Sequence, residues 1–279
     1  MNKNQITLFL LLVSNFAFGQ TNLYPNTSFL KNLHLDSDYN SLKSKISQEF
    51  ANVKPGKWGE FVNGVDEDLI TKNKIVALTF DACGGKNADG YDKDLIDFLK
   101  KEKIPATLFV TGKWIDANYL TFIELSKEPL FEIENHGLNH KPCSIDGESE
   151  FGIKGTPNIG DAIDEIEANA IKIENITHTK PIFYRSATAY TDEACAKIAT
   201  ALGVTMISFD VLSGDAIPNT PKNVIENNVL KTIRPGAIII MHFNRPNWNT
   251  AEALYELIPN LQKQGYSFAK LRDYHLKAK

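Results

Sequence analysis

The sequence predicts an α/β fold: a distorted (β/α)7-8 barrel of parallel strands with an N-terminal extension. Apolar runs rich in β-branched residues, typical of strands buried on both faces of a parallel sheet, recur between residues 75 and 271. Amphipathic stretches with helical spacing separate these runs. Polar residues follow several of the predicted strands at their carboxyl ends, which is the edge where α/β folds place their chemistry.

The first predicted strand is the clearest. Residues 75–80, IVALTF, form an apolar run that ends at Asp81, and Gly84 and Gly85 follow shortly after it. Two glycines let the backbone turn sharply and approach a ligand closely. An Asp in this position more often caps a helix or forms a turn, so Asp81 does not establish a catalytic site without the remaining strands.

Predicted strands and helices alternate along the rest of the chain. The later strands are expected at 106–111, 130–133, 181–184, 204–209, 237–241 and 266–271. Helices are expected after Asp92 or Asp94, either of which can act as the N-cap, and at 114–127, 159–173, 192–202, 221–232 and from Thr250. The polar segment up to Pro157 is expected to be a long loop. Seven strands alternating with helices favour a closed or nearly closed barrel.

The amino terminus resembles a secretory signal. Residues 1–20 contain Lys3, an apolar segment over 6–18 and the small-x-small sequence Ala17-Phe18-Gly19. We therefore expect a secreted or periplasmic protein that begins near Gln20 or Thr21 and has no membrane span. Residues 21–72 show one helix, at 38–53, and no clear strand, and are interpreted as an extension packed on the main domain, residues 73–279.

Composition excludes one class of partner. The formal net charge is −4, which argues against binding to the phosphate backbone of a nucleic acid, because such binding needs a basic face. Aromatic residues suit stacking on sugar rings but also fill ordinary cores, so they decide little. We expect a monomer.

Three cysteines permit one disulfide in an oxidising compartment. Cys83 and Cys143 each follow a motif that could lie in the site, so a Cys83–Cys143 bridge is the preferred prediction, with Cys195 as a buried thiol on a helix. The competing hypothesis is that Cys83 or Cys143 ligates a metal ion.

Two histidines follow the predicted strand at 130–133. His136 and His140 are four residues apart and would lie on the same side of one helical turn, so both could reach a single divalent cation. This spacing is a weak signal by itself, and the absence of an HExxH motif counts against a common type of metallopeptidase.

Three further polar residues lie at the ends of later strands. Arg185 ends the strand at 181–184, Asp215 follows the strand at 204–209, and His242 ends the strand at 237–241. Each alone could be a surface or salt-bridge residue. A (β/α) barrel, however, brings the carboxyl ends of its strands to one face, so these residues are predicted to share a pocket with Asp81 and the two histidines.

In this order the motifs resemble those of the polysaccharide deacetylase family, the NodB-homology or carbohydrate esterase 4 type, over residues 73–275. The matching segments are Thr79-Phe80-Asp81-Ala82, His136 to His140, Arg185-Ser186-Ala187-Thr188, Asp215-Ala216 and Ile240-Met241-His242. The resemblance implies that Asp81 is the general base, oriented by Arg185, and that His242 is the general acid, paired with Asp215. It also implies metal binding by His136 and His140, an oxyanion contact from the Thr188 backbone N–H, and a substrate contact at Ile240.

Ala82 is the main departure from the family pattern, because a second Asp at that position completes the family's metal site. Candidate replacements are Asp89, Asp92, Cys83 or water. The expected cofactor is a divalent metal, with zinc favoured over cobalt or nickel. Ala187 and Ala216 replace a family Pro and Trp, which would open the site.

The expected activity is that of a secreted metal-dependent hydrolase that removes acetyl groups from a carbohydrate polymer, with N-acetylated amino sugars as substrates. One alternative is a catalytically silent glycan-binding protein that has lost the metal site. An unusual zinc amidase acting on peptides is a third.

Overall fold

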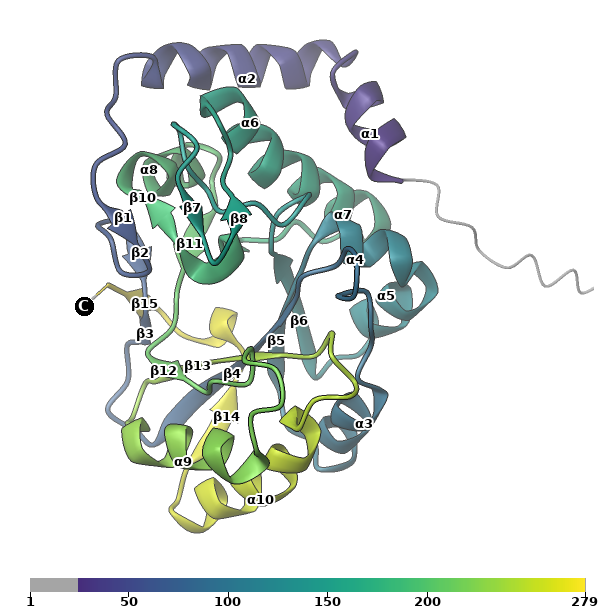
Figure 1. Ribbon diagram of the computed structural model, residues 1–279, viewed down its shortest axis with the longest axis vertical. Helices are drawn as coiled ribbons and strands as arrows, with labels where there is room; N and C mark the ends of the chain where they lie inside the picture. Colours follow the sequence, from purple (N-terminus) through teal and green to yellow (C-terminus); the bar gives the residue numbers. More distant parts are fainter. Residues whose placement is uncertain (1–24, 279) are drawn as a thin grey trace, which may run out of the picture.

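The computed structural model describes residues 25–278, and the predicted signal peptide, residues 1–20, lies outside them (Figure 1). Its main sheet has nine strands, all paired in parallel. Along the sheet the order is β12 (Val211–Leu212), β13 (Ile238–His242), β4 (Ile75–Ala82), β5 (Ala106–Val110), β6 (Phe131–Asn135), β9 (Phe183–Tyr184), β11 (Thr205–Ile207) and β2 (Val65–Asp66), and β14 (Ser267–Ala269) pairs with β4. The predicted distorted (β/α) barrel is confirmed.

Helices cover the outside of the sheet (Figure 1). They are α3 (Lys93–Lys101), α4 (Gly112–Ala117), α5 (Tyr119–Ser126), α6 (Ile159–Ile163), α7 (Asn169–Thr177), α8 (Glu193–Ala201), α9 (Lys222–Thr232) and α10 (Thr250–Lys263). The helix expected at 114–127 is divided at Asn118, and a π-helical turn, Asp164–Ala168, joins α6 to α7 within the helix expected at 159–173. Within residues 25–278, no helix is long and apolar enough to cross a bilayer.

The alternation of side chains along β4 decides which residues face the site. Val76, Leu78 and Phe80 pack into the large apolar cluster under the helices. Successive side chains of a strand point to opposite faces, so Thr79 and Asp81 lie on the inner face of the barrel. Segments that follow β4, β6, β9, β11, β12 and β13 line the same pocket as Asp81.

The N-terminal extension packs on the sheet and also adds to it. It contains α1 (Asn26–Leu33) and α2 (Ser37–Phe50), then β1 (Trp58–Gly59), β2 and β3 (Asp68–Leu69). We predicted no strand here, but β2 pairs with β11, β1 pairs with β10 (Thr191–Asp192) and β3 pairs with β15 (Leu276–Lys277). Strands of two residues are too short to show a periodicity, and their pairing is decided by distant partners. Similarly, the predicted loop before Pro157 contains a short hairpin, β7 (Ser149–Glu150) and β8 (Ile153–Lys154).

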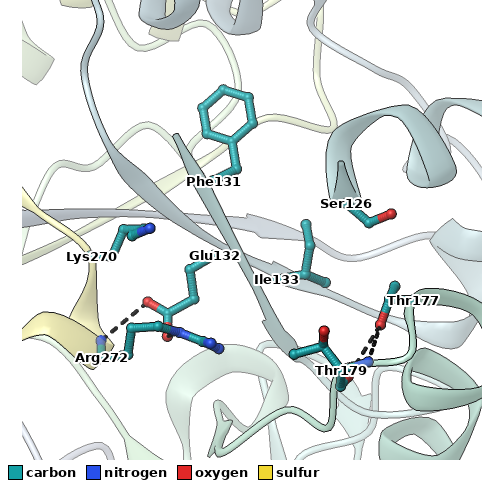
Figure 2. A pocket seen from close by; sticks show the side chains of 8 residues that line it. All are labelled: Ser126, Phe131, Glu132, Ile133, Thr177, Thr179, Lys270 and Arg272. Atoms are coloured by element: carbon teal, nitrogen blue, oxygen red, sulfur yellow. Dashed lines mark hydrogen bonds and ion pairs between the residues drawn. The ribbon is translucent and has the colours of Figure 1, made fainter. Parts of the chain in front are cut away.

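An ion-pair network closes the amino-terminal end of the barrel, opposite the site. Figure 2 shows Glu132, Arg272 and Lys270 around a small cavity of about 140 Å³. Arg272 Nε donates to Glu132 Oε1 at 2.7 Å, and Arg272 Nη2 donates to Glu134 Oε1 at 3.0 Å. Both carboxylate side chains are fully buried. One guanidinium thus contacts two buried carboxyl groups.

Arg272→Met is expected to lower the free energy of unfolding by about 3–5 kcal/mol, because it leaves two buried carboxyl groups without their cationic partner. Burial and then the charge of Glu132 already raise the pKa of Glu134 well above its ordinary value, against the opposing charge of Arg272. A carboxyl whose pKa is raised by folding destabilises the folded protein as pH rises above the unfolded pKa. The loss measured by urea unfolding should therefore be larger at pH 8 than at pH 5.

Lys270→Met is the matched control for this change. Lys270 is a neighbouring cation whose ammonium group donates an exposed hydrogen bond to the Pro129 carbonyl, at 3.2 Å. Its replacement should change stability by no more than about 0.5 kcal/mol. Equal losses of unfolding free energy in Arg272→Met and Lys270→Met would contradict a stabilising role for the contacts of Arg272 with Glu132 and Glu134.

Candidate active site

A pocket of about 550 Å³ opens at the carboxyl ends of the strands. Eight of the residues predicted from the sequence line it: Asp81, Cys83, His136, His140, Thr188, Asp215, Ile240 and His242. They come from segments that lie far apart in the sequence. The structure therefore brings together the groups that the strand-end argument placed at one face.

Asp81 is held by a buried arginine. Arg185 Nη1 donates to Asp81 Oδ1 at 2.8 Å and to Thr79 Oγ1 at 2.9 Å, while Arg185 Nη2 donates to the Ser208 carbonyl at 2.8 Å. The guanidinium also lies 4.3 Å from the centre of the Phe109 ring. Both charged side chains are almost completely buried. Arg185 therefore orients Asp81 without entering the pocket itself.

His136 and His140 lie in residues 136–141, here called the histidine loop. The loop is not helical: Gly137 and His140 have positive φ values of 88° and 58°. The predicted helical turn is thus wrong, but the backbone reversal still brings the two imidazole rings to 5.0 Å between centroids. His136 Nδ1 lies 2.8 Å from the Arg185 carbonyl, which can only accept, so Nδ1 carries a proton. Nε2 lies 3.7 Å from Asp81 Oδ2 and is the ring nitrogen that would bind a metal ion once deprotonated.

Cys83 lies beside the two histidines. Its sulfur and one ring nitrogen from each of His136 and His140 all lie within 4.8 Å of one another. Burial opposes ionisation of the Cys83 thiol, but the charge of His140 and hydrogen bonds with His136, His140 and His242 outweigh burial and hold its pKa well below the ordinary value. Cys83 is thus a thiolate-type ligand candidate and not an inert core thiol.

The predicted Cys83–Cys143 disulfide is wrong, because all three cysteines are free. Cys83 turns into the pocket at the end of β4. Cys143 instead packs in a separate apolar cluster, with Tyr184 and Cys195, where it is fully buried. The two motifs meet at the pocket, but their cysteine side chains point to different parts of the molecule.

The residues present fit a divalent metal ion of the zinc class. Ala82 is fully buried in the main apolar cluster and offers no ligand. Asp89 accepts a hydrogen bond from the Gly85 backbone, and Asp92 caps α3 by accepting from Leu95 N at 3.0 Å. Of the protein groups predicted as a third ligand, Cys83 is therefore the one placed beside both histidines. One thiolate and two imidazoles are preferred ligands of zinc and leave a fourth position open for a water or a substrate.

His242 lines the same pocket and is fixed by Asp215. Its Nδ1 lies 3.0 Å from Asp215 Oδ1, and its backbone N–H donates to Asp215 Oδ2 at 2.7 Å. Ser213 and Thr250 donate to the same carboxylate. Burial would lower the pKa of His242, but the charge and hydrogen bond of Asp215 outweigh it and raise that pKa well above its ordinary value. His242 is therefore suited to donate a proton.

Thr188 has a backbone conformation that is rare for its residue type. Its φ is 64°, and the next residue, Ala189, has a φ of 60°. A β-branched residue in the left-handed region is an outlier, and such backbone strain is concentrated at functional sites. The strained turn lies at the pocket wall near Ile240, which also lines the pocket.

The walls of the pocket contain residues that the motif argument missed. They include Glu60 from the extension, Phe151 and Ile153 from the β7–β8 hairpin, Phe209, and Arg245, whose guanidinium lies 4.9 Å from the Trp248 ring centre. No sequence motif marks them. They reach the pocket through loops and short strands whose positions depend on tertiary contacts.

Comparison with known proteins identifies the family. The sequence profile described as polysaccharide deacetylase matches residues 68–207. Peptidoglycan-N-acetylmuramic acid deacetylase PdaA of Bacillus subtilis is 30% identical over 206 residues, 73% of this chain and 72% of that protein. Its solved structure, described as a family 4 carbohydrate esterase, is 25% identical, with a TM-score of 0.62 over 86% of this chain and 89% of that one.

Two other solved structures are similar to this chain. A family 4 pseudoenzyme from Bacillus anthracis is 25% identical, with a TM-score of 0.60 over 72% of this chain and 65% of that one. A family 4 acetyl xylan esterase from Clostridium thermocellum, solved with a cobalt ion, is 26% identical, with a TM-score of 0.58 over 72% of this chain and 89% of that one. The chain therefore belongs to the polysaccharide deacetylase family, as its motifs predict, and is a carbohydrate deacetylase by that membership.

Proposed function

We propose that this protein is a secreted or periplasmic, metal-dependent deacetylase of N-acetylated amino sugars in a cell-wall or chitin-like polymer. The observation that carries the proposal is the convergence on one pocket of a buried Asp81–Arg185 pair, a His242–Asp215 pair and a Cys83–His136–His140 ligand set. The similarity to a peptidoglycan deacetylase supports the substrate class. The signal-like sequence of residues 1–20 supports export.

The metal would be held by His136, His140 and the Cys83 thiolate, which takes the place of the family's missing carboxylate. A bound ion of the zinc class would polarise the acetyl carbonyl and lower the pKa of a water molecule. Asp81, which Arg185 holds at 2.8 Å, accepts the proton of the attacking water. The fixed orientation of Asp81 removes the need to reorganise the base during the reaction.

The His242–Asp215 pair serves the leaving group. His242 donates a proton to the departing amine, and Asp215 stabilises the imidazolium and fixes its Nδ1–H at 3.0 Å. The backbone N–H of Thr188 contributes to the oxyanion hole, where the strained turn holds it in place. The products are acetate and a free amino sugar.

Acetate release and metal content test this proposal together. Purified protein should contain about one equivalent of zinc-class metal and release acetate from acetylated chitooligosaccharides or peptidoglycan. The exported protein should begin at Gln20 or Thr21, which intact mass can determine.

A catalytically silent glycan-binding protein is the second candidate. It is favoured by Ala82 and by the similarity to a family 4 pseudoenzyme. Absence of bound metal together with absence of acetate from every glycan tested would support it over the hydrolase. Metal binding without acetate from glycans would redirect the search to other acetylated substrates.

A further inference from the structure

A buried glutamate outside the predicted motifs contacts the histidine loop from behind. Glu165 Oε1 accepts hydrogen bonds from the backbone N–H groups of Asn139, at 2.9 Å, and Lys141, at 3.0 Å. The Glu165 carbonyl accepts a third, from Leu138 N at 2.9 Å. Glu165 therefore accepts hydrogen bonds from three backbone N–H groups of the loop. Two of them, from Asn139 and Lys141, flank His140.

The fit between Glu165 and the loop is close. Gly137 has a φ of 88°, and a Cβ atom at this position would lie 2.5 Å from Glu165 Oε1. His140 also lies in the left-handed region, with a φ of 58°. Backbone strain of this kind persists only where surrounding contacts hold it. The two hydrogen bonds that flank His140 are such contacts, and this backbone conformation places its ring against that of His136.

Glu165 belongs to the π-helical turn Asp164–Ala168. Turns of this type are rare and occur frequently at functional sites. The next residue, Ile166, accepts a hydrogen bond from Asn135 Nδ2 at 2.7 Å, and Asn135 Oδ1 accepts one from Gly137 N at 2.9 Å. The π-helical turn thus contacts the start of the histidine loop through Asn135 and its end through Glu165.

The same turn is attached to the N-terminal extension. Asp164 Oδ1 accepts from Tyr39 OH and Lys43 Nζ, both at 2.7 Å, and Asp164 Oδ2 lies 3.0 Å from His34 Nε2. These three side chains come from α2 and from the end of α1. Figure 1 shows α2 lying across α6, the helix that leads directly into this turn.

We propose that Glu165 is a positioning residue that holds His140 in its metal-binding orientation, and that Asp164 joins this support to the N-terminal extension. The inference rests on the proposed metal site. It gives the extension a function, since helices remote from the pocket brace the turn that carries Glu165. Neither Glu165 nor helices α1 and α2 need to touch the substrate.

The test is the affinity of the full chain for Zn²⁺, measured by competition with a chromogenic chelator. Glu165→Ala should weaken binding about 10–100-fold, the usual cost of losing a group that orients a metal ligand. Glu165→Gln keeps an oxygen that can accept the two amides and should restore affinity to within about threefold of wild type. Glu167→Ala is the matched control, since Glu167 lies in the same turn but pairs with Lys180, at 3.9 Å.

Thermal unfolding of the metal-free proteins establishes that each variant is folded at the assay temperature. If wild-type protein binds no zinc, the proposed function fails. If wild-type protein binds zinc and Glu165→Ala binds it equally well, or no more weakly than Glu167→Ala, the positioning role of Glu165 is overturned. Asp164→Ala should weaken binding at least about threefold, and wild-type affinity in that variant would overturn the link to the extension.

Discussion

Cys83→Ala is expected to abolish tight metal binding. With Co²⁺ as the probe, wild-type protein should show a sulfur-to-cobalt charge-transfer absorption in the near ultraviolet, because a thiolate ligates the ion. The variant should lose this absorption. Its affinity for zinc should fall by more than the roughly 10–100-fold cost of losing an outer-shell contact, since a ligand itself is removed.

Cys143→Ala is the matched control, because Cys143 is also a free thiol but is buried in a different cluster. It should keep the cobalt absorption. Cys83→Asp should bind metal without the charge-transfer absorption, because a carboxylate then takes the place of the sulfur. Persistence of the absorption in Cys83→Ala would exclude Cys83 as a ligand.

Asp81→Asn is expected to reduce kcat for acetate release by about 10²–10⁴-fold while metal binding is retained. Asparagine cannot accept the proton of the attacking water, but its side-chain oxygen can still accept the hydrogen bond from Arg185 Nη1. The fold should therefore persist, which circular dichroism and thermal unfolding can verify. Zinc content measured on the same sample separates loss of the base from loss of the metal.

Asp89→Asn provides the control for Asp81. Asp89 is an exposed carboxylate in the loop after β4, and it accepts a hydrogen bond from Gly85 that asparagine can also accept. Activity in this variant should match wild type. If Asp81→Asn kept more than about a tenth of wild-type kcat, another group would have to be the base.

The main parts of the site could be predicted because they follow single strands. Asp81 and His242 lie at the ends of long apolar runs, and parallel strands bring their carboxyl ends to one edge. The expected pairs are also present, with Arg185 on Asp81 and Asp215 on His242. Short strands could not be predicted in the same way. A pair such as Val65–Asp66 has no periodicity, and its place in the sheet depends on β11.

The cysteine chemistry could not be predicted from chain order. Cys83 and Cys143 both follow site motifs, but which way each sulfur points depends on how the loop after β4 turns and on which core cluster receives Cys143. Glu165 was also invisible in the sequence. It lies in a stretch with ordinary helical spacing, which does not indicate a π-helical turn. The contact of its carboxylate with the histidine loop appears only in the tertiary structure.

The sequence by itself determined the alternation of strands and helices, the parallel barrel and the order of the catalytic motifs, because these depend on hydrophobic periodicity and on residues adjacent to strand ends. Only the tertiary structure decided that Cys83 is the candidate third ligand and that Cys83 and Cys143 are not bonded to each other. It alone also decided which residues the extension contacts. These features depend on distances between side chains whose residues are separated by tens of positions, and local sequence does not encode such distances.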